Sequence, residues 1–185
     1  DEAKGTLRLP QQWEGTGLAT IAFGQGVSVT AMQLAAAFNT IANDGKYVAP
    51  SLILGTAGSD GVIHPIPPAA QRQVIRATTA ATMREMLTGV VTQGTGGPAK
   101  VVGYSVAGKT GTAMKTWSNK GEDGVGYSDD YTSIFAGFVP ANDPAVTIVI
   151  VLDEPDEHLA GLTAAPVFSE IATVALRQLG IPETK

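Results

Sequence analysis

Two apolar segments of strand length dominate the C-terminal half of the chain and restrict the folds that it can adopt. Tyr131–Val139 and Val146–Leu152 are joined by a short connection that contains Pro140 and Pro144. Proline interrupts regular structure, and a short connection between two such segments is typical of neighbouring antiparallel strands. The sequence therefore predicts a hairpin at the centre of an antiparallel sheet.

A long helix is predicted directly after these strands. Thr163 precedes Pro166, which is tolerated in the first turn of a helix, and Gly180 is a stop signal. Side chains at helical spacing predict an apolar face made of Val167, Ile171 and Val174, beside Leu179. Strands followed by a covering helix indicate an α+β domain with an antiparallel sheet flanked by helices.

Two further helices are predicted in the N-terminal half. Thr30 and Gln33 form a capping-box pattern before a helix over Ala31–Ala42, which Asn43-Asp44-Gly45 would end. A second helix is predicted over Ala80–Val91, capped by Thr78 or Thr79. Its buried stripe would consist of Met83, Met86, Leu87, Val90 and Val91.

The remaining segments are expected to form strands, turns and loops. Residues 1–27 show no sustained period and predict extended, irregular chain, whereas Tyr47–Leu54 predicts a strand. Val101–Val106 and Gly108–Met114 predict one long strand with a bend. Residues 115–130 are rich in Gly, Asp and Ser and predict a polar loop.

The composition excludes several classes of site. The net charge is −5 without a run of Lys or Arg, so nucleic acid is not expected as a partner. The chain has no cysteine, and His64 and His158 lack neighbours at ligand spacing, so neither a metal site nor a cofactor is expected. Among the remaining acidic stretches only Asp153–Glu157 is a candidate cation site. No apolar stretch is long enough to span a membrane.

The segment Gly103–Thr110 matches the phosphate-binding pattern G-x-x-x-x-G-K-[ST] at every fixed position. That pattern binds phosphate because a helix begins at its Lys and directs amide groups at the anion. Here Gly111 follows, and then a polar stretch of poor helix propensity. We therefore expect strand and turn over Gly103–Met114, and a nucleotide hydrolase is disfavoured.

Lys109-Thr110-Gly111 on a strand supports a different chemistry. A strand at the border of a cleft can bind an extended peptide as an additional strand, and a Lys beside a hydroxyl can hold a carboxylate. Gly111 would let the substrate approach the backbone. Trp117, in the stretch after the motif, is a candidate for lining a substrate groove. Adjacent side chains point to opposite faces of a flat strand, so Lys109 and Thr110 can serve one cleft only if the strand is twisted and lies at the border of that cleft.

The setting of this tripeptide resembles class B penicillin-binding proteins. Segments similar to that family occur in the same order over about residues 13–182. They are Phe23–Ala35, Ile41–Gly45, Met86–Gly96, Gly103–Lys115, Phe135–Pro140 and Ala164–Phe168. The resemblance implies the serine β-lactamase/transpeptidase fold and acyl transfer in peptidoglycan synthesis, with the motifs S-x-x-K, S-x-N and K-[ST]-G.

The resemblance also implies ligands, partners and a location. The ligands would be peptidoglycan stem peptides and the β-lactams that mimic them. The partners would be the upstream part of the same domain and proteins of a cell-wall synthesis complex for division or elongation. The site would lie at the extracytoplasmic face of the bacterial cell membrane, held there by an anchor upstream of this chain.

Only the last of the three family motifs is present. No serine of the chain has Lys three residues on or Asn two residues on. We therefore expect residues 1–185 to be the C-terminal part of the domain, inactive alone. By the resemblance, Thr112 would supply one backbone N–H of the oxyanion hole and Lys109 the cationic group. A penicillin-sensing binding domain of the same fold is an alternative to an enzyme.

Overall fold

Three antiparallel strands from the C-terminal half form the central sheet. They are β7 (Ala107–Ser118), β8 (Val125–Val139) and β9 (Val146–Asp153), in the order β7-β8-β9. The chain is described by a computed structural model that covers residues 3–13, 15–67, 69–118 and 125–184. Ala107 pairs with Phe138 and Val139 pairs with Val146, which confirms the predicted hairpin.

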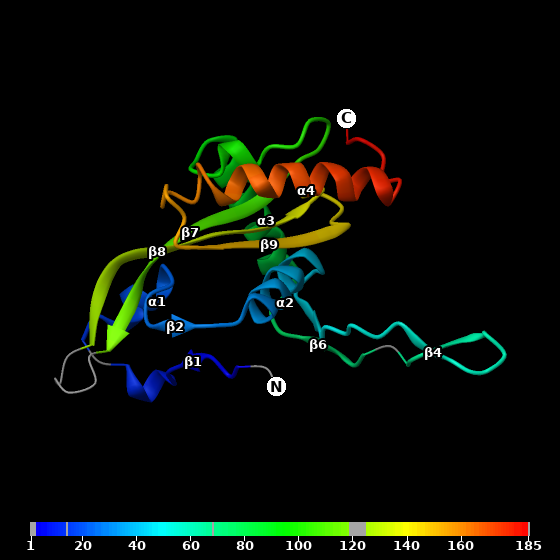
Figure 1. Ribbon diagram of the computed structural model, residues 1–185, viewed down its shortest axis with the longest axis horizontal. Coiled ribbons are helices and arrows are strands. Elements are labelled where there is room, and N and C mark those ends of the chain that lie inside the picture. Colours follow the sequence, from blue (N-terminus) through cyan, green and yellow to red (C-terminus); the bar gives the residue numbers. More distant parts are fainter. Residues whose placement is uncertain (1–2, 14, 68, 119–124, 185) are drawn as a thin grey trace.

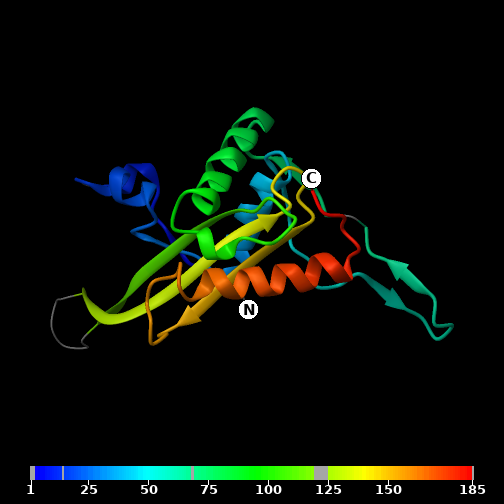
Figure 2. The same cartoon turned by 90° about the horizontal axis from the view of Figure 1, so that it is seen from above.

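Helices cover both faces of this sheet, which confirms the predicted antiparallel sheet flanked by helices. Helix α4 (Ala164–Gln178) packs on β8 and β9 from one face, and α2 (Ala31–Ala42) packs on the same strands from the other (Figures 1 and 2). Helix α3 (Ala77–Thr92) lies beside β7 and also contacts α2. The sheet is thus enclosed between helices that come from both halves of the chain.

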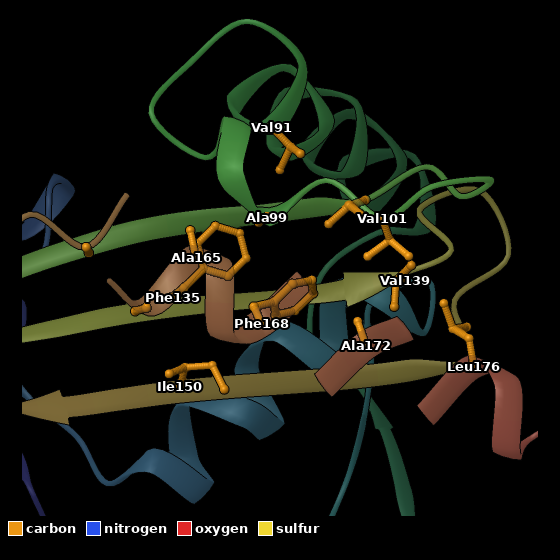
Figure 3. Packing of buried hydrophobic residues seen from close by; sticks show 13 residues of the cluster. Val91, Ala99, Val101, Phe135, Val139, Ile150, Ala165, Phe168, Ala172 and Leu176 are labelled. Atoms are coloured by element: carbon orange, nitrogen blue, oxygen red, sulfur yellow. The ribbon is translucent and has the colours of Figure 1, made fainter. Parts of the chain in front are cut away.

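The main core lies between α4 and the sheet. The rings of Phe135 and Phe168 are 4.8 Å apart and tilted by 60°, and both side chains are fully buried. Val91 brings α3 into this cluster, and Ile150 brings β9 into it (Figure 3). A smaller cluster on the opposite face joins Phe138 to α2 and α3. The two clusters thus place β8 between α4 on one face and α2 and α3 on the other.

The buried face of α4 differs from the predicted one. Ile171 and Val174 are about half exposed, at 45% and 52%, although both were expected in the core. The side chains that are buried instead repeat at three- and four-residue spacing and include three alanines: Ala164, Ala165, Phe168, Ala172 and Leu176. Small side chains let the helix approach the sheet closely, which apolar character alone does not reveal.

The other two predicted helices are confirmed, with changes in detail. Helix α2 has the predicted bounds, and its capping box is formed: Thr30 accepts from the Gln33 backbone while Gln33 accepts from the Thr30 backbone. Helix α3 begins at Ala77 after an N-cap residue, Arg76, whose side chain makes no cap hydrogen bond. Met86 is 63% exposed, so its predicted place in the core is wrong.

The first 76 residues contain several short elements that were not predicted. Residues 1–27 contain a short helix, and the strand expected over Tyr47–Leu54 ends at Val48. A separate hairpin of β4 and β5 extends away from the sheet (Figure 1). The elements are β1 (Thr6–Leu7), η1 (Pro10–Gln12), α1 (Gly17–Ala22), β2 (Val27–Ser28), β3 (Lys46–Val48), β4 (Gly55–Ala57), β5 (Ile63–Pro65) and β6 (Gln71–Gln73).

Strand β7 is longer than predicted at its C-terminal end and shorter at its N-terminal end, and β8 begins earlier than predicted. Much of the stretch 115–130 is strand, since β7 extends to Ser118 and β8 begins at Val125. Val101–Val106 is not part of β7: Val101 and Tyr104 form an isolated bridge across a turn, after the short helix η2 (Gly97–Ala99). In the described part of the chain, no helix has the length and apolar character needed to cross a membrane.

Candidate active-site wall on strand β7

Strand β7 presents the Lys-Thr-Gly sequence at an edge of the central sheet. β8 pairs with one side of β7, and no described strand pairs with its other side. Along the paired side, Lys109 lies opposite Ala136 and Thr110 lies opposite Phe135. The strand continues through Lys109 and Thr110 without starting a helix, which confirms that the phosphate-loop pattern does not form a phosphate-binding loop here.

The ammonium group of Lys109 reaches around this edge toward the next residue. Its Nζ lies 2.9 Å from the carbonyl oxygen of Thr110 and 3.5 Å from the Thr110 hydroxyl oxygen. The Lys109 side chain is exposed, and no acidic side chain of the described residues forms an ion pair with it. A charged donor and a hydroxyl donor are therefore adjacent and open to an external anion.

Lys115, farther along the same strand, has a different environment. Its Nζ lies 2.6 Å from Glu154 and 3.0 Å from Asp153. These hydrogen bonds, that to Glu154 first, raise the pKa of Lys115 to about 12. Two carboxylates already satisfy this ammonium, so Lys109 is the better candidate for binding a ligand carboxylate.

The backbone groups of Thr110 and Thr112 lie along the same edge. The carbonyl of Thr110 accepts from Lys109, which indicates that it points away from β8. In an antiparallel strand the N–H and C=O of one residue point to the same side, and alternate residues share that side. The N–H of Thr112 is thereby placed at the outer edge, where an extended ligand or an oxyanion could accept from it.

Thr112 also contacts the connection between β9 and α4. Its hydroxyl oxygen accepts from the backbone N–H of Ala160 at 3.3 Å. The same connection is attached to β8, because the buried Ser133 hydroxyl donates to the carbonyl oxygen of His158 and the His158 ring stacks on Tyr131 with centroids 4.5 Å apart. The connection over residues 154–163 therefore lies beside β7 and is held by contacts to both β7 and β8.

The two glycines of the motif region have different roles in the fold. A Cβ on Gly108 would lie 2.5 Å from the Phe135 ring and 2.9 Å from the Ala136 carbonyl oxygen, so packing inside the chain requires glycine there. A Cβ on Gly111 would meet only the Ile134 side chain, at 3.7 Å. Nothing in the described residues requires glycine at position 111, and the predicted reason, close approach by an external backbone, stays a prediction.

One residue of this site was missed from the sequence. The hydroxyl oxygen of Thr95 lies 2.7 Å from that of Thr110. Thr95 follows α3 and is separated from the motif by a turn, so local sequence patterns do not connect the two residues. The available signal was the Gly94-Thr95-Gly96 sequence, which allows a tight turn at the end of a helix.

The other candidate residues do not contribute described side chains to the ligand-binding edge of β7. Trp117 belongs to β7 by its backbone, but its side chain lies outside the described residues. His64 is in the exposed hairpin strand β5, and no group of three or more His, Asp or Glu side chains suited to a metal occurs among the described residues. Asp153 and Glu154, considered for a cation, are paired with Lys115.

Comparisons with known proteins point to one family. The family described as the penicillin binding protein transpeptidase domain matches residues 1–173. The chain is 39% identical to penicillin-binding protein PbpB of Mycolicibacterium smegmatis and 36% identical to the probable peptidoglycan D,D-transpeptidase PbpC of Pseudomonas aeruginosa. Each alignment covers 98% of this chain but only 29% and 30% of those relatives, so the chain spans less than a third of their length.

Solved structures agree with this result. Penicillin-binding protein 3 of Mycobacterium tuberculosis in its apo form is similar over the whole chain, with 37% identity and a TM-score of 0.86. The structure of the same protein with ampicillin gives a TM-score of 0.87, and a further structure contains aztreonam. The chain covers 43% of the apo structure. The similarity extends through β7 and the helices that surround it.

Proposed function

Because the chain belongs to the penicillin-binding protein transpeptidase family, we propose that it supplies the Lys-Thr-Gly wall of a peptidoglycan D,D-transpeptidase. In this proposal residues 1–185 are the C-terminal part of the catalytic domain, and the nucleophilic serine belongs to another part of the protein. The observation that carries it is the exposed Lys109 ammonium beside the Thr110 hydroxyl at the unpaired edge of β7.

The wall would bind the carboxylate end of a stem peptide. Lys109 and Thr110 offer hydrogen bonds to the terminal carboxylate, and a bond from an ammonium to a carboxylate is stronger than one between neutral groups. The peptide backbone would lie along the outer edge of β7 as an additional strand. Gly111 would permit close approach of the peptide backbone.

The reaction would be acyl transfer through a serine ester. The serine oxygen attacks the carbonyl carbon before the terminal D-Ala, and the Thr112 N–H donates to the oxyanion that forms. The C–N bond then breaks, D-Ala leaves with a proton on its amine, and an acyl-enzyme remains. An amine of a neighbouring stem peptide attacks the ester, forms the cross-link and releases the serine.

The same wall would recognise β-lactams. The ring carboxylate of penicillins, or the N-sulfonate of aztreonam, matches the terminal carboxylate of the stem peptide, and attack by the serine opens the four-membered ring without releasing a leaving group. The product is an acyl-enzyme that occupies the site. Two of the similar solved structures contain a β-lactam, aztreonam or ampicillin, which supports such binding by the family to which this chain belongs.

Exposed apolar side chains support a partner part within the same domain. Leu7, Leu18 and Phe23 are 71%, 67% and 70% exposed in the segment that precedes α2. Apolar surface of this kind usually marks a contact with another protein surface. The upstream part of the domain would cover it. The complete protein would act on peptidoglycan at the outer face of the cytoplasmic membrane, anchored upstream and in contact with other cell-wall synthesis proteins.

The test is acylation of the full-length protein by penicillin, followed by intact-mass measurement and peptide mapping. We expect one adduct per chain, on a serine outside residues 1–185. Absence of an adduct would contradict the proposed activity. An adduct on a serine within residues 1–185 would contradict the division of the site between two parts of the domain.

A further inference from the structure

We propose that Thr95 is a positioning residue of the carboxylate-binding wall, acting through the hydroxyl of Thr110. This inference rests on the proposed function of Lys109 and Thr110. Its basis is the 2.7 Å distance between the Thr95 and Thr110 hydroxyl oxygens. Lys109 Nζ is 3.5 Å from the same Thr110 oxygen, so the three polar groups form a chain along the edge of β7.

Thr95 is held in place on both sides of its own backbone. The N–H groups of Gly94 and Gly96 both donate to the carbonyl oxygen of Val90, at 3.1 and 3.0 Å, which fixes the turn after α3. On the other side, a Cβ on Gly161 would lie only 2.6 Å from the Thr95 carbonyl oxygen. The connection between β9 and α4 therefore lies against the Thr95 backbone and restricts its movement.

The turn is also anchored in the core below the site. Gly96 is buried, and a Cβ there would lie 3.2 Å from the Val90 side chain and 3.3 Å from the Phe135 ring. Phe135 is the residue directly opposite Thr110 in the β7–β8 register. The same ring thus supports the turn and the strand, so packing fixes the backbone positions from which the Thr95 and Thr110 side chains extend.

Either hydroxyl of this pair can be the donor, and a bound carboxylate would set the direction. A threonine hydroxyl has one proton to donate and can also accept hydrogen bonds. When Thr95 donates to the Thr110 oxygen, the Thr110 proton is left to donate to a ligand carboxylate, which Lys109 also binds. A bond from Thr95 further polarises the Thr110 hydroxyl and reduces its rotation before the ligand arrives. Thr95 would therefore speed the reaction only with ligands that carry the carboxylate.

The test uses the full-length protein and the second-order rate constant of its acylation by penicillin. We expect Thr95→Val, which keeps the side-chain shape, to lower this rate constant about three- to ten-fold, the range for one net hydrogen bond. Thr95→Ser should restore it to within about two-fold. The matched control is Thr92→Val, since the exposed Thr92 hydroxyl donates to the helix carbonyl of Thr88 at 3.1 Å. It should leave the rate constant unchanged.

A second ligand separates positioning from a structural effect. Penicillin methyl ester lacks the anion, so Thr95→Val should leave its slower acylation unchanged. An equal fall with the acid and the ester would overturn the positioning role. The double variant Thr95→Val with Thr110→Val should react no more slowly with penicillin than Thr110→Val alone, and additive losses would also overturn the role.

The design distinguishes failure of this inference from failure of the proposed function. If Thr110→Val lowers the rate constant for penicillin and Thr95→Val does not, the positioning role is wrong and the proposed wall stands. If neither Thr110→Val nor Lys109→Ala lowers it, the wall itself is wrong, and the inference about Thr95 fails with it.

Discussion

Lys109 Nζ lies 2.9 Å from the carbonyl oxygen of Thr110, although the two side chains leave β7 on opposite faces. The contact is possible because β7 is an edge strand and the long lysine side chain extends around its border. The sequence alone places the side chains of Lys109 and Thr110 on opposite faces of a strand. The sheet order β7-β8-β9 leaves one side of β7 without a described partner strand, and the two groups meet at that side. In a strand paired on both sides, a neighbouring strand would occupy this border and its backbone would bond to the Thr110 carbonyl.

Packing of α4 on the sheet yields a stability prediction. Replacing Phe168 by alanine removes a fully buried ring that contacts Phe135, and such changes cost about 3–5 kcal/mol. Urea-induced unfolding of the domain measures this loss. Ile171→Ala is the matched control on the outward face of the same helix, where 45% exposure should limit the loss to about 1 kcal/mol or less. A larger loss at Ile171 than at Phe168 would restore the face predicted from sequence.

The ion pairs of Lys115 predict a dependence on alkaline pH. Hydrogen bonds to Glu154 and Asp153 raise the pKa of Lys115 from 10.5 to about 12. A pKa raised by folding gives a stability contribution that is complete below pH 10.5 and is lost as the pH rises through about 12. The thermal midpoint of wild type should therefore exceed that of Lys115→Met at pH 9, and the difference should shrink toward pH 12.

The exposed Lys100 provides the comparison for this effect. Lys100→Met should leave the difference in midpoint from wild type nearly constant over the same pH range. A gap between wild type and Lys115→Met that widens as the pH rises would be incompatible with the assigned ion pairs.

Residues 1–185 alone should not react covalently with penicillin. Nucleophilic catalysis needs a serine with a base in reach, and no serine of this chain has Lys three residues on. Only one N–H of the oxyanion hole, that of Thr112, is assigned to this chain. Intact mass after incubation with penicillin should match the unmodified chain, with circular dichroism confirming that it is folded. A stoichiometric adduct would show that a serine of this chain is the nucleophile.

Local signals were sufficient for the elements that depend on neighbouring residues. The capping box of Thr30 and Gln33 predicted the start of α2, and Asn43-Asp44-Gly45 predicted its end, because both signals act within one turn. The apolar runs of β8 and β9 predicted strands correctly, because a strand buried in a sheet needs consecutive apolar residues. The polar stretch 115–130 predicts a loop, whereas β7 extends to Ser118 and β8 begins at Val125. Their backbone pairing there leaves no periodic apolar pattern in the sequence.

Features that depend on distant packing were not predictable in the same way. The buried face of α4 combines Phe168 and Leu176 with alanines that fit against the sheet, such as Ala165 and Ala172, whereas Ile171 and Val174 are about half exposed. In the site, the strand position of Lys109 and Thr110 followed from their sequence context. The contribution of Thr95 did not, because a turn brings it to Thr110 only in the folded chain.

The most direct test of the Lys-Thr-Gly wall is the acylation of full-length Lys109→Ala by a fluorescent penicillin. Losing a charge-assisted hydrogen bond costs roughly 1.5–3 kcal/mol, so we expect the labelling rate to fall about 10- to 150-fold. The thermal midpoint should change little, because the side chain is exposed. Lys100→Ala, on another exposed lysine, should label like wild type. An unchanged labelling rate for Lys109→Ala, with or without a large fall in its midpoint, would contradict the assignment of Lys109 to the ligand-binding wall.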